Sequence, residues 1–379
     1  MSHNRQQAIS VQLSTPLWAG SQNQIVNDVT NKITGYSHEL KANGGFVAAD
    51  LEISDTQNNI ERWLDWIGHT VTVYNDSLGT IFEGFVNNVE ITIGALTVNR
   101  GPMLDIKNRV AVAYQTMSYS TNPPIGGQQA VTAYATNAAS VARYGQLEGI
   151  ISGGSGSATA MEQLRDTFLE SNALPGTSQN VNDRQSPPSA RISVRGFYDL
   201  LTCYFYSEPT GTGAINLSTK LANILAAAPS VTYTTRIATN TLQVPAFSDG
   251  QATAEGEISD LVAKGDANDD RYLFGVYAGR TAVYEAAPTD IEYRMAINDN
   301  GVVVENGAGR VMPWDVRPGR WLMVTGILVG QAETAPTGND PRMIFIESAR
   351  YTYPVGLQIN GGKFGRLSQR LAKLGLGGM

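Results

Sequence analysis

The most specific spacing of chemically active residues lies between Asp266 and Asp270, where the sequence reads Asp-Ala-Asn-Asp-Asp. Alternating acid and amide side chains in this order begin a calcium-binding loop, whose oxygen atoms surround the ion. The position that requires glycine in such a loop holds Arg271, and the position of the closing acid holds Tyr277. The alternative is a solvated turn in which the Asp side chains bond their own backbone. We expect the turn and keep calcium binding as the alternative.

Two pairs of neighbouring acids have the composition of a hydrolytic site. They are Glu255 with Glu257 and Asp269 with Asp270. A glycosidase needs two carboxyl groups on either side of the bond that it cleaves. Adjacent acids on polar segments more often form a solvated face, and we expect that arrangement here.

Other catalytic chemistry has little material in this chain. There are three histidines (His3, His38 and His69) and one cysteine, Cys203, which excludes an internal disulfide framework and a four-cysteine zinc site. The sequence contains no GxxxxGK loop, no GxGxxG after a strand, no HExxH and no GxSxG. We therefore predict that no residue is catalytic, none binds a cofactor, none binds a metal, and the protein is not an enzyme.

Composition limits the classes of partner. Charged residues make up 16% of the 379 residues, against roughly 25% in a typical soluble domain. Such a surface is either covered by neighbouring molecules or is neutral and rich in Thr, Asn, Ser and Gln. The net charge of -7 argues against general nucleic-acid binding, which needs clustered Lys and Arg. No run approaches the ~18 apolar residues of a membrane span, and the first ten residues lack the apolar core of a secretion signal. We expect synthesis in a cytoplasm.

The first third of the chain has the period of β-strands. The stretch from Tyr36 to Ile53 alternates on both sides of Asn43-Gly44-Gly45, which predicts a hairpin. A short helix capped by Ser54 or Asp55 follows, and its Trp63 and Trp66 are expected to pack in the core rather than stack on a ligand. The stretch Glu83–Tyr114 alternates again, with a predicted hairpin turn at Gly94-Ala95.

The middle of the chain mixes helices and strands. A helix is predicted over 157–174, capped by Ser157 or Thr159 and ended by Pro175. The polar segment Gly176–Ser189 is typical of a junction between domains. Helices are also predicted over 218–228, with Ser218 as the cap, and over 253–264.

The last third is again predicted to be strands. Alternation begins at Tyr272, and Asp299-Asn300-Gly301 marks a hairpin. An apolar strand after Gly319 pairs with 344–353 in this prediction. A basic amphipathic segment, 361–379, packs either on its own domain or on a neighbour.

Three passages together resemble one family. The first contains Gly101-Pro102-Met103-Leu104-Asp105 and Asn108-Arg109-Val110, after the strand with Phe82-Glu83-Gly84. The second is Ala139-Ser140-Val141 with Tyr144-Gly145 and Glu148, and the third is Pro313-Trp314 followed by Arg317-Pro318-Gly319. Their order is similar to that of baseplate hub (tail-tip) proteins of long-tailed bacteriophages. The resemblance covers roughly Tyr36 to Tyr353.

This resemblance implies a mainly β, multidomain protein with two tube-like antiparallel β-barrel domains and smaller α/β modules between them. The expected division is a tube-like domain at 1–150, middle hub domains at 151–290, a second tube-like domain at 291–360 and the basic tail at 361–379. Three subunits would form a pseudo-sixfold ring that ends the tail tube. Expected partners are a distal tail or tail tube protein, a fibre or tip protein and the tape-measure protein, with DNA passing through the lumen without specific binding.

Two other functions stay open at this stage. A hexameric distal tail protein would have one tube-like barrel rather than two. A carbohydrate-binding or hydrolytic β-protein would have a cleft with an exposed Trp beside two carboxylates, for which Trp314 with Asp315 is the only local indication.

Overall fold

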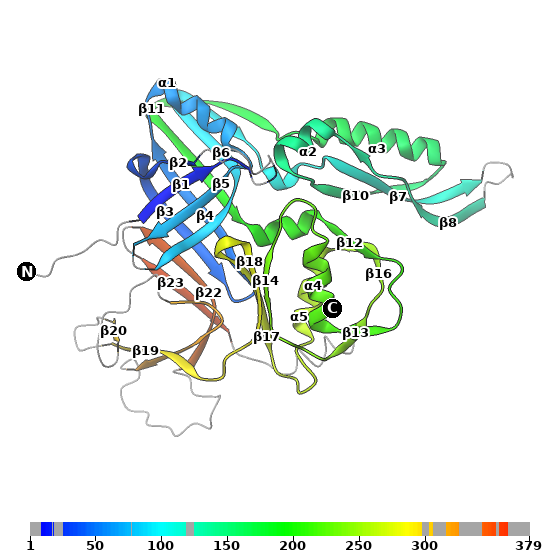
Figure 1. Cartoon of the computed structure of the whole chain (residues 1–379). Coiled ribbons are helices and arrows are strands. Elements are labelled where there is room, and N and C mark those ends of the chain that lie inside the picture. Colours follow the sequence, from blue (N-terminus) through cyan, green and yellow to red (C-terminus); the bar gives the residue numbers. More distant parts are fainter. Residues whose placement is uncertain are drawn as a thin grey trace, which may run out of the picture.

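The structure is a computed structural model that describes residues 9–16, 18, 26–76, 78–118, 125–297, 303–305, 316–325, 343–353 and 356–362. The fold is mainly β, as the sequence predicts. One large sheet, one smaller sheet and two separate strand pairs account for the described strands (Figure 1).

The large sheet joins strands from all parts of the chain. Its members are β1 (Ile9–Ser14), β2 (Val26–Asp28), β3 (Ile33–Lys41), β4 (Gly44–Ser54), β5 (Thr70–Asn75), β6 (Gly79–Arg100), β11 (Thr177–Gly196), β14 (Thr234–Ile237), β17 (Tyr272–Tyr277), β18 (Thr281–Ala286), β19 (Ile291–Ile297), β20 (Val303–Glu305), β21 (Trp321–Thr325), β22 (Met343–Tyr353) and β23 (Leu357–Gly362). The main path runs β2-β1-β5-β6-β11-β4-β3-β22-β21-β19-β20. Its two ends do not pair with each other within the described residues, so a single chain shows an open sheet and no closed barrel.

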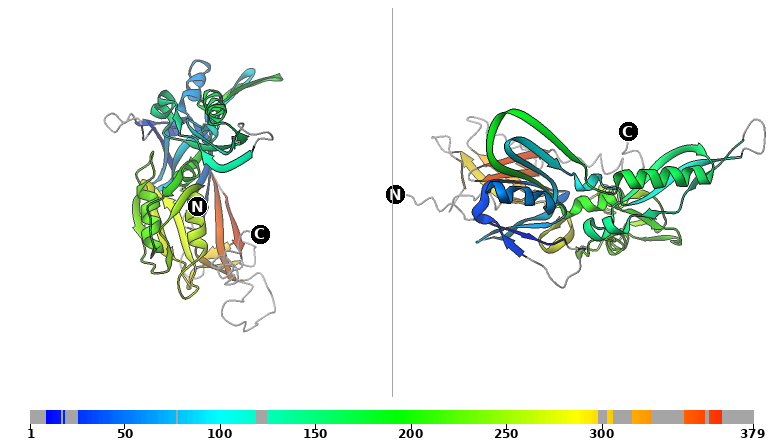
Figure 2. Two further views of the ribbon diagram at one scale, coloured as in Figure 1. Left: turned by 90° about the vertical axis from the view of Figure 1, so that its right-hand side faces the viewer. Right: turned by 90° about the horizontal axis from the view of Figure 1, so that it is seen from above.

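The first and last thirds of the chain meet inside this sheet. Strand β22 pairs antiparallel with β3, from Ser348 opposite Lys41 to Tyr353 opposite Tyr36. The orange strands of the last third therefore lie beside the blue strands of the first third (Figures 1 and 2). The predicted pairing of 344–353 with the strand after Gly319 is also confirmed, because β21 and β22 are antiparallel neighbours.

The hairpin predicted at Asn43-Gly44-Gly45 is confirmed by the pairing of β3 with β4. Gly44 and Gly45 have φ angles of +115° and +75°, which glycine adopts without steric cost. Strand β17 then runs parallel to the first residues of β4, with Val276 opposite Gly45. This turn is therefore also the place where a distant strand joins the hairpin.

The hairpin predicted at Gly94-Ala95 is wrong. Strand β6 continues through this point for 22 residues, because β11 runs antiparallel beside it. Gly94 has a φ of +60°, and residues 182–185 bulge out of β11 at the shift of register between Val181 and Ser186. The predicted junction Gly176–Ser189 is thus mostly part of β11. Its residues 177–187 are exposed, so the backbone ladder rather than apolar burial holds them in the sheet.

A separate arm projects from the large sheet (Figures 1 and 2). It consists of the small sheet and two helices: β7 (Arg109–Ser118), β8 (Ile125–Val131), β9 (Ala135–Thr136), β10 (Glu148–Gly156), α2 (Ala138–Tyr144) and α3 (Ala158–Asn172). Helix α3 matches the predicted helix over 157–174, and the Ser157 side chain caps it by accepting from the Ala160 N–H at 3.3 Å. Strands β7 and β10 are parallel, and α3 packs against both.

A helical module lies below the arm in Figure 1. It contains α4 (Leu217–Ala226), α5 (Ala254–Ala263) and the strand pairs β12 (Phe205–Glu208) with β16 (Ser248–Thr253) and β13 (Ala214–Asn216) with β15 (Gln243–Pro245). Both helices were predicted, but Ser218 does not cap the first. Asn216 occupies the cap position, and the Ser218 hydroxyl donates instead to the Asn240 carbonyl at 3.2 Å.

The remaining helices are short. They are α1 (Gln57–Ile60) and 3₁₀ turns at Thr30–Lys32, Glu61–Trp66, Met103–Asp105, Phe197–Cys203 and Ala278–Arg280. Thr56, not Ser54 or Asp55, stands at the N-cap of α1. The Asp55 carboxylate instead accepts from Lys32 at 2.6 Å and from the Trp63 indole at 3.1 Å. Trp63 is buried in the main core and Trp66 packs against it, as predicted.

Candidate functional site

Asn108, from the first of the three passages, is fully buried and joins that passage to the second. Its amide nitrogen donates to the Gly145 carbonyl at 2.7 Å and to the Ser140 hydroxyl at 3.2 Å. Its amide oxygen accepts from the Leu147 N–H at 2.8 Å. A buried polar side chain with every partner satisfied rigidifies and specifies its surroundings. We call the side chains of Asn108, Ser140 and Glu148 the polar node.

Glu148 completes this node between β7 and β10. Its side chain is almost fully buried and forms an ion pair with Arg109, which lies opposite it in the strand register. The other carboxylate oxygen accepts from the Phe205 N–H at 2.9 Å. The Ser140 hydroxyl donates to the Ala173 carbonyl at the end of α3. The node therefore ties the arm to the helical module, and its polar groups are occupied by structural bonds.

The third passage holds the segment before β21 against β22. The Gly319 N–H donates to the Ile346 carbonyl at 2.7 Å, and Gly319 has a φ of +82°. The Val316 carbonyl accepts from the Tyr351 hydroxyl. A Cβ atom on Gly319 would lie 2.7 Å from the Leu273 side chain. Glycine is therefore needed here both for its backbone angle and for its small size.

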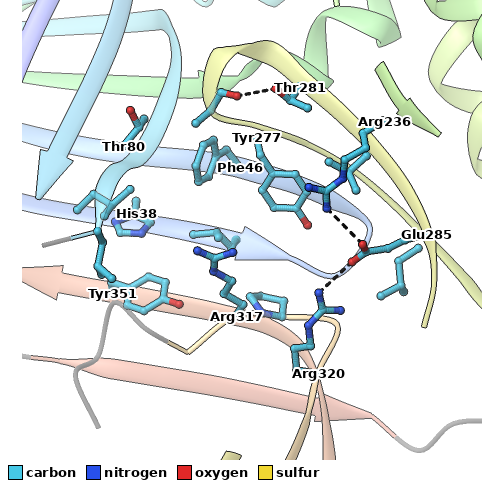
Figure 3. Close-up of a pocket in the computed structure, with 18 residues that line it drawn as sticks. His38, Phe46, Thr80, Arg236, Tyr277, Thr281, Glu285, Arg317, Arg320 and Tyr351 are labelled. Atoms are coloured by element: carbon cyan, nitrogen blue, oxygen red, sulfur yellow. Dashed lines mark hydrogen bonds and ion pairs between the residues drawn. The ribbon is translucent and has the colours of Figure 1, made fainter. Parts of the chain in front are cut away.

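Beside this passage lies a cavity of about 310 Å³, which we call the seam cavity (Figure 3). Strands β3, β4, β6, β14, β17, β18 and β22 contribute to its wall, together with Leu78, Ala278 and the segment that precedes β21. Its apolar wall includes Leu40, Phe46, Ile81, Leu273 and Val283. The cavity thus lies where the first, middle and last parts of the chain meet.

The charged residues of the seam cavity are three arginines and one acid. Glu285 accepts from Arg320 at 2.9 Å and lies 3.5 Å from Arg236. Arg320 is also paired with Glu292 at 2.9 Å. The Arg317 side chain has no carboxylate partner among the described residues, and Figure 3 shows it pointing into the cavity between His38 and Glu285. The lining therefore carries excess positive charge.

Two further polar side chains face the same space. Burial lowers the pKa of His38 to about 3, so its ring is neutral at ordinary pH and adds no charge. Burial, followed by the nearby Glu285 carboxylate, raises the pKa of Tyr277. Its hydroxyl therefore stays protonated and can donate a hydrogen bond. Within the described part of the chain this hydroxyl has no hydrogen-bond partner.

The Asp266–Asp270 segment forms the expected turn. One Asp266 carboxylate oxygen accepts from the Asn268 N–H at 2.8 Å and from the Asp270 N–H at 2.9 Å. Asp269 has a φ of +65°, which Asp tolerates better than most residues. In the described ranges no group of three or more His, Cys, Asp or Glu side chains has the arrangement of a metal site.

The acids Glu255 and Glu257 bind different partners. Glu255, at the start of α5, accepts from the Tyr198 hydroxyl at 3.0 Å and from the Ser259 hydroxyl at 2.8 Å. Glu257 accepts from the Ser248 hydroxyl at 2.7 Å. They are half-buried structural acceptors rather than the solvated face that was predicted.

Ser248 is also close to a lysine, an arrangement that sequence reasoning did not detect. Buried Lys220 donates to the Ser248 hydroxyl at 2.7 Å and to the carbonyls of Ala246 and Phe247 at 2.7 and 3.1 Å. An ammonium group has three protons to donate, and these three bonds use all of them. Lys220 is thus a charged clamp on this loop and not a free base that could activate the serine.

The remaining residues considered from the sequence include one cysteine and the other histidines. Cys203 is buried as a free thiol, and His69 is half-buried with its ring 4.6 Å from that of Trp66. His3, Trp314, Asp315, the Asp299–Gly301 turn and the basic tail after 362 lie outside the described residues. None of the helices in the described part of the chain has the length and apolarity that crossing a membrane requires.

No protein-family model and no curated protein matches the sequence. Among solved structures, the chain is similar to a tail protein from Neisseria meningitidis, with a TM-score of 0.39, 8% identity and coverage of 91% of both chains. It is also similar to the 43 kDa tail protein of prophage MuSo2 from Shewanella oneidensis, with a TM-score of 0.39, 10% identity and coverage of 91% of this chain and 92% of that one. The function is therefore argued below from the chain's own residues.

Proposed function

We propose that this protein is a structural component of a phage virion tail, and specifically the baseplate or tail-tip hub. In this proposal three copies form a pseudo-sixfold ring that ends the tail tube. The tube-like domains are 1–150 and 291–360, the middle hub domains are 151–290, and 361–379 is a docking tail. The protein carries out no reaction.

The observation that carries the proposal is the role of the three passages that resemble the hub family. Asn108, Ser140 and Glu148 form the buried polar node, and Gly319 bonds the segment before β21 to β22. Each of these residues makes bonds that hold separate segments together. Their chemistry is that of a rigid scaffold, which is what a hub requires.

The open sheet supports the assembly of several copies. Strand β2 stands at one end of the path and β20 at the other. All three residues of β2 are exposed, and its outer backbone groups have no strand partner among the described residues. An unpaired edge is a template for pairing with another chain. The low charge content of 16% also suits a surface that is covered by neighbours.

The acidic balance suits a channel for DNA. With a net charge of -7, a lumen of this protein repels phosphate groups rather than holding them. In the proposal the sixfold end of the ring contacts a distal tail or tail tube protein. The threefold end contacts a fibre or tip protein, and the tape-measure protein enters from above.

Sedimentation velocity of the purified chain tests this proposal. We expect a particle of three times the 40.7 kDa chain mass. A mass of six chains would favour the distal tail protein instead. A monomer at all accessible concentrations would contradict the ring.

A further inference from the structure

We propose that the seam cavity is a binding site for a carboxylate carried by a small apolar or aromatic body. The inference does not depend on the tail function, because it uses only the shape and chemistry of the cavity. The third motif passage supplies Arg317 and Pro318, but the cavity was not predicted, since the rest of its lining comes from segments that are far apart in the sequence.

The size of the cavity sets the size of the ligand. Its volume of about 310 Å³ is at the lower end of the ~300–1,000 Å³ range of small-molecule sites. Such a space accommodates a body about as large as one aromatic side chain with a short polar group. The Phe46, Leu40 and Leu273 side chains provide the apolar contact that such a body needs.

The excess positive charge of the cavity lining favours a negatively charged ligand. Arg236 and Arg320 share Glu285, Arg320 is also paired with Glu292, and Arg317 has no acid within the described residues. The guanidinium group presents a planar fork of donors that matches a carboxylate. Arg317 points into the cavity from its rim (Figure 3), so a carboxylate there gains a partner without displacing an existing ion pair.

Tyr277 supplies a second donor on the opposite wall. Its hydroxyl forms no bond with the described residues, and Figure 3 shows its ring reaching into the same space as Arg317. This hydroxyl can therefore donate a hydrogen bond to a ligand oxygen in the cavity without breaking a bond within the described residues. Arg317 and Tyr277 together therefore define a pair of donors for a carboxylate, next to the apolar side chains of the cavity wall.

Such a carboxylate comes either from a free small acid or from the end of a polypeptide. Three probes separate these cases: hydrocinnamate, its uncharged amide, and N-acetylphenylalanine, which represents a polypeptide C-terminus. We expect both acids to bind in titration calorimetry and the amide to bind about tenfold more weakly or not at all. Tighter binding of N-acetylphenylalanine than of hydrocinnamate assigns the polypeptide source, and the reverse order assigns the free acid.

Substitutions test the two donors. Arg317→Gln is expected to weaken binding of the better acid about tenfold, and Tyr277→Phe about threefold. The matched control is Arg62→Gln, because Arg62 is exposed and lies outside the cavity. Arg317→Lys keeps the positive charge but lacks the planar guanidinium donors. This variant replaces Arg317→Gln in the test if the Gln variant does not fold. Binding of the acids that equals that of the amide, or that is unchanged in both Arg317 variants and in Tyr277→Phe, would overturn the proposal.

Discussion

At the scale of single residues, Asn108 is a buried side chain that joins two segments of the chain. It belongs to the connection before β7, yet its side chain bonds only to the segment 140–147. Removing it leaves the Gly145 carbonyl and the Leu147 N–H buried without their partner. The cost of such a change comes mainly from the groups that are left behind.

We therefore expect Asn108→Ala to lower the free energy of unfolding by about 4 kcal/mol, from two or three lost buried bonds. Urea unfolding measures this loss. The control is Asn58→Ala, because Asn58 is exposed on α1, and it should change stability by less than about 0.5 kcal/mol. Equal effects of the two substitutions would show that the polar node is not structural.

His38 makes stability depend on pH in the acid direction. Burial lowers the pKa of His38 from 6.5 to about 3. Between these two pH values the His38 ring is protonated in the unfolded chain and neutral in the folded protein. Stability from this residue is present above about pH 6.5 and is lost as the pH falls towards 3. At about pH 5 the loss should be ~2 kcal/mol. His38→Gln should remove this component of the slope, and identical slopes for both proteins would contradict the account.

Asp199 makes stability depend on pH in the opposite direction to His38. Burial raises the pKa of Asp199 to about 6, although the Arg195 side chain 3.6 Å away opposes the shift. Between about pH 4 and 6 the folded protein holds a proton that the unfolded chain has released. Stability from this group therefore falls as the pH rises through that window. Asp199→Asn should be more stable than the original chain near pH 7, by on the order of 2 kcal/mol, with no difference near pH 3. A variant that is less stable near pH 7 would contradict this assignment.

At the scale of elements, the pairing of β17 with the first residues of β4 is a tight constraint. A Cβ atom on Gly45 would lie 2.4 Å from the Val276 carbonyl oxygen, whereas a Cβ on Gly94 would have no atom within 4 Å. Both glycines have positive φ angles, +75° and +60°. Alanine therefore carries the same backbone penalty at both positions, and only Gly45 adds a collision.

We expect Gly94→Ala to cost about 1 kcal/mol, which is the backbone penalty alone. Gly45→Ala should cost at least about 3 kcal/mol more, because β17 must move away from β4. Denaturant unfolding of the two variants gives the difference directly. Equal losses of unfolding free energy in the two variants would contradict the close approach of the β4 and β17 backbones at Gly45.

Local signals in the sequence predicted the elements that depend on their neighbours along the chain. The Asn43–Gly45 hairpin and the helix that begins after Ser157 are of this kind, since turn and cap residues determine both. Strand β6 was interrupted in the prediction because its partner β11 lies roughly 90 residues away. The exposed first half of β11 has no apolar alternation that could reveal it. The seam cavity was not predictable for a similar reason, because Arg317, Tyr277 and His38 converge only through the pairing of distant strands.

At the scale of the whole molecule, we propose that one chain is an incomplete part of a larger ring. The large sheet is open, its first and last strands belong to different thirds of the chain, and an arm extends away from it (Figure 1). A monomeric enzyme has no need of an exposed sheet edge, which promotes association with other chains. A subunit of a ring uses such an edge to contact its neighbour.

Electron microscopy of the purified protein tests this central claim most directly. The account predicts closed rings with threefold symmetry, a central channel, and one face that approximates sixfold symmetry. The β2 edge should lie at the contact between neighbouring subunits. Isolated single-chain particles at high protein concentration, or rings with true sixfold symmetry, would contradict the proposed hub function.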